Sequence, residues 1–145
     1  SYAAPKLVSL QERLFSLPPD DAAGAFRRIQ HDFLRMVRED EQLGQAICIV
    51  VLNVEATQRQ TGLQTYLLEE KNRLLAAFEE AFTRLARAGA TRPGHAPDRL
   101  TRAFLAYMSG LLNQHFSPIG HVDLAQEGEE LLEVFFEGVF GGEAV

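Results

Sequence analysis

One stretch of this chain has the pattern of a buried β-strand, and it constrains the fold more than any other feature. The stretch runs from Ala46 to Leu52 and consists of seven apolar residues, rich in isoleucine and valine. Periodicity alone does not separate such a run from a buried helix. A lone strand would leave its backbone donors and acceptors unpaired, and no Asn-Gly or Asp-Gly hairpin signal supplies a partner strand. We therefore predict a helix over about Glu41 to Thr57, central in the fold and surrounded by the other helices.

Prolines, glycines and capping residues divide the rest of the chain into pieces of helical length. In each piece, apolar residues recur at spacings of three and four, which is typical of amphipathic helices. We predict helices over about 7–15, 22–40, 61–87 and 98–115, and a last helix that ends at Gly141-Gly142. Candidate N-caps are Asp20 or Asp21, Asp98, and Asp123, which forms a capping-box pattern with Gln126. The sequence thus predicts one all-α domain over residues 1–145, a bundle of about six helices.

The charged residues are divided unevenly along the chain. From Ala103 to Val145 there is no lysine or arginine and there are seven acids, whereas the other 102 residues carry 14 basic and 13 acidic groups. A nucleic-acid interface needs clustered cations that displace counterions from phosphate, and this pattern lacks them. No segment has the length of a membrane span, the first residues lack a signal-peptide core, and the single cysteine fits a reducing compartment. We therefore expect a cytoplasmic protein that makes no DNA contact through these residues.

No motif for catalysis or for a cofactor stands out. The chain contains no G-x-G-x-x-G, Walker A, H-E-x-x-H or G-x-S-x-G sequence. We therefore expect no enzymatic activity, no cofactor and no metal. His115, His121 and Asp123 flank one connection, where they could hold a metal or form caps and loop hydrogen bonds. We favour caps and loop hydrogen bonds.

The helix predicted over about 22–40 carries a basic face formed by Arg27, Arg28, Arg35 and Arg38. Two interpretations remain open. The face is either solvated and paired with Asp32 and Glu39, or docked against a neighbouring domain. We favour the first interpretation.

The last predicted helix has two apolar faces. Leu124, Leu131, Phe135 and Val139 form one stripe, and Leu132, Phe136 and Phe140 form another about 100° further round. A helix at the edge of a small bundle needs one buried face, so the second face must meet something else. A second copy of the chain is the natural partner, because Ser109 and Gly110 on the preceding helix permit close helix approach.

Three features of the C-terminal third carry a family resemblance. They are Tyr107-Met108-Ser109-Gly110-Leu111, a short loop with Pro118, and Asp123-Leu124 at the start of the last helix. The helix that ends in "LARAGATRPGHAPD" and the central helix match as well. Over about Gln30 to Phe140, the chain resembles the C-terminal domain of TetR-family transcriptional repressors, particularly regulators of multidrug efflux. Members of that family begin with a three-helix DNA-binding domain that contains a helix-turn-helix, and this chain starts near what would be the fourth helix.

The resemblance implies a homodimer in which the last two helices of each copy form a four-helix bundle. We assign Leu112, Phe116, Leu132, Phe136, Val139 and Phe140 to that interface. DNA would be bound only through a domain missing from this chain.

The resemblance also implies an internal cavity for a small, mostly apolar effector. Ile47, Val51, Leu105, Met108 and Ser109 match positions that line the pocket in the family, and helix phase adds Phe33, Cys48, Glu55 and Phe78. From its chemistry alone, Glu55 lies either at the surface, as most acids do and as we favour, or at the rim of the cavity, where its carboxylate would attract a cationic effector. The alternative function is a purely structural homodimerisation module with a packed interior and no ligand.

Overall fold

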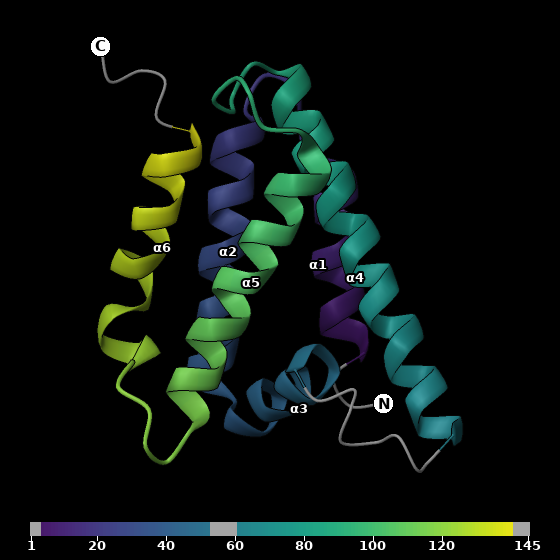
Figure 1. The fold of residues 1–145 in the computed structure, drawn as a ribbon, viewed down its shortest axis with the longest axis vertical. Coiled ribbons are helices and arrows are strands. Elements are labelled where there is room, and N and C mark those ends of the chain that lie inside the picture. The colour runs from purple at the N-terminus through teal and green to yellow at the C-terminus, as the bar shows by residue number, and fades with distance from the viewer. Residues whose placement is uncertain (1–3, 53–60, 141–145) are drawn as a thin grey trace.

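The computed structural model describes residues 4–52 and 61–140, and it is all-helical in these ranges (Figure 1). The six helices are α1 (Ala4–Phe15), α2 (Ala22–Glu39), α3 (Glu41–Leu52), α4 (Thr61–Arg87), α5 (Pro97–Phe116) and α6 (Leu124–Phe140). The predicted all-α fold is confirmed, and the run from Ala46 to Leu52 is helical. None of the helices in these ranges is both long and apolar enough to cross a lipid bilayer.

The centre of the bundle is α2, not α3. Helix α2 packs on α1, α3, α4 and α6. Its Phe26 is completely buried, and its ring centroid lies 5.2–6.1 Å from the centroids of five other rings, those of Phe78, Phe82, Phe104, Phe136 and Phe140. Aromatic side chains bury large areas and favour such edge-to-face contacts, so this cluster organises the core.

Helix α3 lies across one end of the bundle, where it contacts α2, α4 and α5 (Figure 1). Leu43, Gly44 and Ile47 are buried, whereas Gln42 and Gln45 are exposed. The prediction of a helix surrounded by the others is therefore wrong for its first half, because polar residues occupy one side of it. The side chains of residues 48–52 lie outside the described residues.

The N-terminus of α6 is capped as the sequence predicts, with one difference. Asp123 Oδ1 accepts a hydrogen bond from the backbone N–H of Ala125 at 3.0 Å. The backbone N–H of Asp123 donates to Glu127 Oε2 at 3.1 Å, so Glu127 and not Gln126 returns the bond of the box.

The starts of α5 and α2 also differ from expectation. Helix α5 begins at Pro97, so Asp98 lies in the first turn and not at the N-cap. Proline suits the first helical position, because its φ is already helical and its missing N–H would have no partner there. Asp21 does occupy the N-cap of α2, but its carboxylate pairs with Arg28 at 2.7 Å and forms no capping bond.

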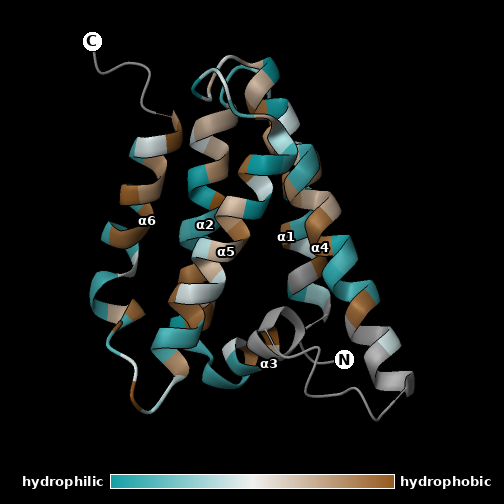
Figure 2. Ribbon diagram, viewed as in Figure 1, coloured by the Kyte–Doolittle hydropathy of each residue, from teal (hydrophilic) through white to brown (hydrophobic). Residues whose placement is uncertain are grey.

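Acidic residues of the C-terminal third pair with basic residues of α2 where α6 packs on that helix. Arg27 and Arg38 pair with the acidic face of α6, and Arg35 pairs with Asp32 at 2.9 Å. The contacts to α6 are Arg27 with Glu133, Arg38 with Glu129 at 3.8 Å, and His31 with Glu129 at 3.7 Å. The favoured interpretation of the basic face is therefore correct in that it is paired within the chain, although two of the four arginines have their partners on α6. Along α2, α5 and α6, hydrophobic and hydrophilic residues recur in turn, as expected for helices that bury one face (Figure 2).

Candidate functional site

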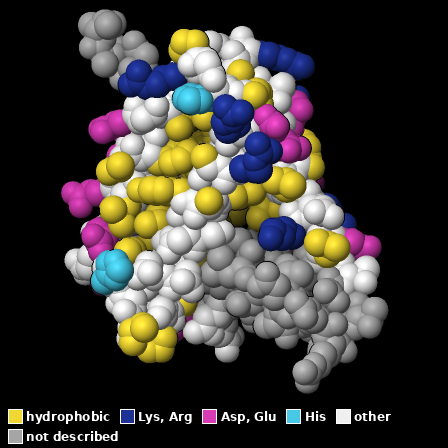
Figure 3. Space-filling model, in the orientation of Figure 1, with side chains coloured by type: hydrophobic (Ala, Val, Ile, Leu, Met, Phe, Trp, Pro, Cys, Tyr) yellow, Lys and Arg dark blue, Asp and Glu magenta, His cyan; other side chains and the backbone are white. Residues whose placement is uncertain are grey.

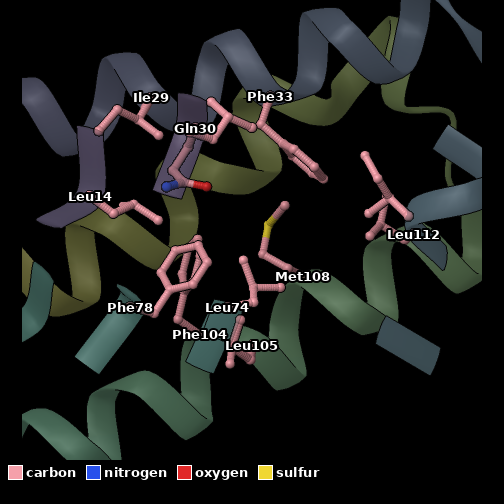
Figure 4. A pocket seen from close by; sticks show the side chains of 12 residues that line it. Leu14, Ile29, Gln30, Phe33, Leu74, Phe78, Phe104, Leu105, Met108 and Leu112 are labelled. Atoms are coloured by element: carbon pink, nitrogen blue, oxygen red, sulfur yellow. The ribbon is translucent and has the colours of Figure 1, made fainter. Parts of the chain in front are cut away.

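An apolar cavity of about 50 Å³ lies inside the bundle, and five helices contribute to its wall (Figure 4). Helix α6 does not line it. The lining residues are Leu10, Leu14, Ile29, Gln30, Phe33, Ile47, Leu74, Phe78, Phe104, Leu105, Met108 and Leu112. Among these described residues, Gln30 is the one polar side chain and none is charged. Apolar walls with a small number of placed polar groups are typical of small-molecule sites.

Five of the nine residues assigned to a ligand site from the sequence meet at this cavity. They are Phe33, Ile47, Phe78, Leu105 and Met108, and they come from α2, α3, α4 and α5. Ser109 lies outside the cavity. The side chains of Cys48 and Val51, and the whole of Glu55, lie outside the described residues. That these positions bind a ligand stays a prediction.

Gln30 was not among the site residues predicted from the sequence, although the sequence contains a signal for it. Gln30 lies four residues after Phe26 and three before Phe33, in phase with the buried stripe of α2. A polar residue at an apolar phase marks either a satisfied core group or a functional one. The cavity identifies Gln30 as a candidate for a functional group.

The Gln30 side chain is buried without a partner for its donor. The residue is 2% exposed, and its Nε2 has no hydrogen-bond partner among the described residues. Figure 4 shows the amide of Gln30 directed into the space between α2 and the side chains of α4 and α5. A buried donor left unpaired costs about 1–3 kcal/mol. This cost singles Gln30 out from the apolar wall.

A second hollow of about 260 Å³ lies between α4 and α5. Its lining residues are Lys71, Asn72, Leu74, Leu75, Leu105, Ala106 and Ser109, so the predicted site residue Ser109 belongs to this outer groove. Leu74 and Leu105 line both the groove and the cavity. These two side chains therefore lie between the cavity and the groove.

The connection between α5 and α6 uses its polar residues for capping. His115 Nδ1 accepts a hydrogen bond from the backbone N–H of Leu124 at 3.1 Å, and Asp123 caps the same helix. The favoured prediction for His115 and Asp123 is therefore confirmed. Across the part of the chain that the structure describes, no group of three or more His, Cys, Asp and Glu side chains could hold a metal ion.

Four of the six residues assigned to a dimer interface are core residues of the single chain. Leu112, Leu132, Phe136 and Phe140 are buried, at most 8% exposed, so they offer no surface to a second copy. The stripe Leu132–Phe136–Phe140 faces α2, where the Arg27 guanidinium lies 5.0 Å from the Phe136 ring centroid. The other two assigned residues, Phe116 and Val139, are half-buried.

The outward side of α5 and α6 is nevertheless apolar. Val134 is 61% exposed, and Leu131, Phe135 and Tyr107 are half-buried beside it. The Tyr107 hydroxyl donates to the Leu131 carbonyl oxygen at 2.6 Å, and burial raises the pKa of Tyr107. Figure 3 shows hydrophobic side chains gathered over this face. We call it the α5–α6 face, defined by Tyr107, Leu131, Val134 and Phe135 with the neighbouring Ala103, Gly110 and Gly138.

Comparisons with protein-family models, with curated proteins and with solved structures found no match to this chain. Two features of the described residues therefore bear on the function. These are the apolar cavity with its buried amide and the exposed α5–α6 face.

Proposed function

We propose that this chain is the effector-sensing and dimerisation domain of a TetR-like transcriptional repressor, and that a small, mostly apolar effector binds in the cavity. The observation that carries the proposal is an apolar cavity with one buried amide whose Nε2 has no partner, at the place where five residues assigned from the sequence meet. Protein interiors are normally close-packed and their polar groups satisfied. A cavity that departs from both rules is best explained by ligand binding. The described lining offers no nucleophile or titratable group, which favours binding over catalysis.

The size of the cavity limits the effector. Pockets for drug-sized ligands measure about 300–1,000 Å³, well above the 50 Å³ enclosed here. A compact molecule fits with side-chain adjustment. A larger one, as in multidrug regulators, would have to displace Leu74 and Leu105 and extend into the outer groove.

The signal would pass through α1. Leu10 and Leu14 of α1 line the cavity, and α1 packs on α2 and α4. An effector that favours one position of α1 would alter the placement of a DNA-binding domain attached before it in the intact protein. For tenfold derepression, the affinities of the effector for the two states must differ by about 1.4 kcal/mol.

The α5–α6 face would bind the second copy in the homodimer. An added Cβ at Gly110 or Gly138 would have no neighbouring atom within 4 Å, so helices of another copy could approach closely there. Val134 supplies exposed apolar area at the same face. In this assignment the second copy contacts the outward side of α6 and not the stripe Leu132–Phe136–Phe140, which faces α2.

One observation favours the alternative, a structural dimerisation module without a ligand. Phe26 is fully buried in contact with the fully buried rings of Phe82, Phe104 and Phe136, and the remaining cavity is small. A core packed in this way needs no ligand to fill it.

The two methionines allow a direct test of the cavity. Met108 lines it, whereas Met36 does not. In protein labelled with ¹³C at the methionine methyl groups, we expect apolar compounds from an uncharged and cationic panel to shift the Met108 signal and leave that of Met36. The melting temperature should rise with dose. A panel that moves neither Met108 nor the melting temperature would favour the structural module.

The dimer has its own test. We expect Val134→Arg to halve the mass measured by light scattering, because it places a charge at the centre of the apolar α5–α6 face. Val8→Arg, at a valine on α1 that is 47% exposed, is the matched control and should leave the mass unchanged. Equal masses for the wild type and Val134→Arg would exclude this face as the interface.

A further inference from the structure

We propose that Gln30 recognises the effector, and that the effector is an uncharged, mostly apolar molecule with a hydrogen-bond acceptor such as a carbonyl or ether oxygen. This inference rests on the proposed function, because it requires a molecule in the cavity. It adds the residue that orients that molecule and the chemical class that the residue selects.

Gln30 and Thr101 are the two buried polar residues among those described, and they differ in whether their polar groups have hydrogen-bond partners. The Thr101 hydroxyl donates to the Pro97 carbonyl oxygen at 2.8 Å, so its polarity is satisfied within its own helix. The Gln30 Nε2 has no such partner, and Figure 4 shows the side-chain amide lying among the apolar side chains of the cavity wall. Leucine at position 30 would serve the core better, so the amide has a use other than packing.

Water is a poor partner for this amide. A buried water typically needs two to four polar partners, and Gln30 is the one polar side chain in the described lining. The surrounding side chains, among them Phe78, Phe104 and Met108, are apolar. A molecule with one acceptor and an apolar body satisfies both the amide and the wall.

The unpaired group also selects against charge. Nε2 carries N–H donors, which disfavour a cation and favour an acceptor. A carboxylate would lose its hydration in a cavity where one neutral donor faces it, and that loss exceeds the gain from one neutral hydrogen bond. An uncharged acceptor remains. This differs from the cationic effector expected from Glu55.

A matched pair of probes tests the inference. Cyclopentanone and methylenecyclopentane have nearly the same shape but differ in carrying a carbonyl oxygen or a methylene group. Their affinities would be measured from the ¹³C-methyl signal of Met108, in the wild type and in Gln30→Leu. The desolvation of each probe cancels when the ratio of the two affinities is compared between the proteins.

We expect the preference for the ketone over the alkene to be about tenfold greater in the wild type than in Gln30→Leu. Gln30→Met should behave as Gln30→Leu does, which covers the case in which leucine packs badly. Thr101→Val, which removes a buried hydroxyl that does not line the cavity, should keep the wild-type preference. Both Gln30 variants should melt at a higher temperature without ligand, because an unpaired buried donor is gone.

Two outcomes overturn the inference in different ways. If both probes bind and the ratio is the same in the wild type and in the Gln30 variants, the cavity binds ligands but Gln30 does not recognise them. If neither probe shifts Met108 in any protein, the cavity is not a binding site, and the proposed effector function fails with it.

Discussion

Replacement of Leu112 by phenylalanine would test the cavity without any ligand. Leu112 lies on α5, is 2% exposed and lines the cavity, so the larger ring has space beside it. Leu132 on α6 provides the matched control, because it is fully buried and does not line the cavity. The same change, leucine to phenylalanine within a helix, is thus made with and without adjacent space.

The expected magnitude follows from the cavity volume. Unfilled volume in a core costs about 24 cal/mol per Å³, so 50 Å³ corresponds to about 1.2 kcal/mol. A phenylalanine ring recovers part of this, and we expect the free energy of unfolding to rise by about 0.5–1 kcal/mol. The melting temperature should then increase by about 2–3 °C for a chain of this size. Leu132→Phe should instead lower the free energy of unfolding by about 1–3 kcal/mol, because it overpacks a filled site.

Urea denaturation of both variants measures these changes, and titration with cyclopentanone shows whether Leu112→Phe also weakens binding. The assignment of an unfilled cavity is contradicted if Leu112→Phe destabilises the protein as much as Leu132→Phe does. That result would mean that the space beside Leu112 is already filled in solution.

Two further predictions concern the polar contacts of α6. Burial raises the pKa of Tyr107 above its ordinary value of 10.0, so its contribution to stability is fully present below that pH and is lost as the pH rises through the folded-state pKa. We expect Tyr107→Phe to cost about 1 kcal/mol near pH 7 and to remove this alkaline loss, which urea denaturation at pH 7 to 11 would detect; an unchanged alkaline profile would contradict it. Arg27 and Glu133 are about one third exposed, so a double-mutant cycle with Arg27→Met and Glu133→Gln should give a coupling of about 0.5–1 kcal/mol that shrinks in 1 M salt. A coupling of zero at low salt would show that the ion pair does not contribute to the free energy of unfolding.

The residues that line the cavity were predicted in part from the sequence and in part revealed only by the structure. Helix phase placed Phe33 and Phe78, and the family resemblance placed Ile47, Leu105 and Met108, all of which line it. Gln30 was not found, because a polar residue on an apolar stripe is ambiguous until the residues around it are known.

Local signals were enough to determine the helices. Apolar periodicity and breakers predicted a helix from Thr61 to Arg87, and α4 has those bounds. The Ala46–Leu52 run was predicted as a helix because nothing in the sequence could pair with it as a strand. The first inference depends on residues within a few positions of one another and the second on the residue types present along the chain, which is why the sequence alone supports both.

Tertiary packing decided which faces turn inward. The two stripes of α6 are visible in the sequence, but periodicity gives the angle between them and not their direction. The direction is set by α2, where Arg27 pairs with Glu133 and covers the Phe136 ring, more than 100 positions away in the chain. The same long-range contacts make α2 the central helix, bury Gln30, and leave Val134 on the surface, because only the assembled bundle determines what each side chain meets.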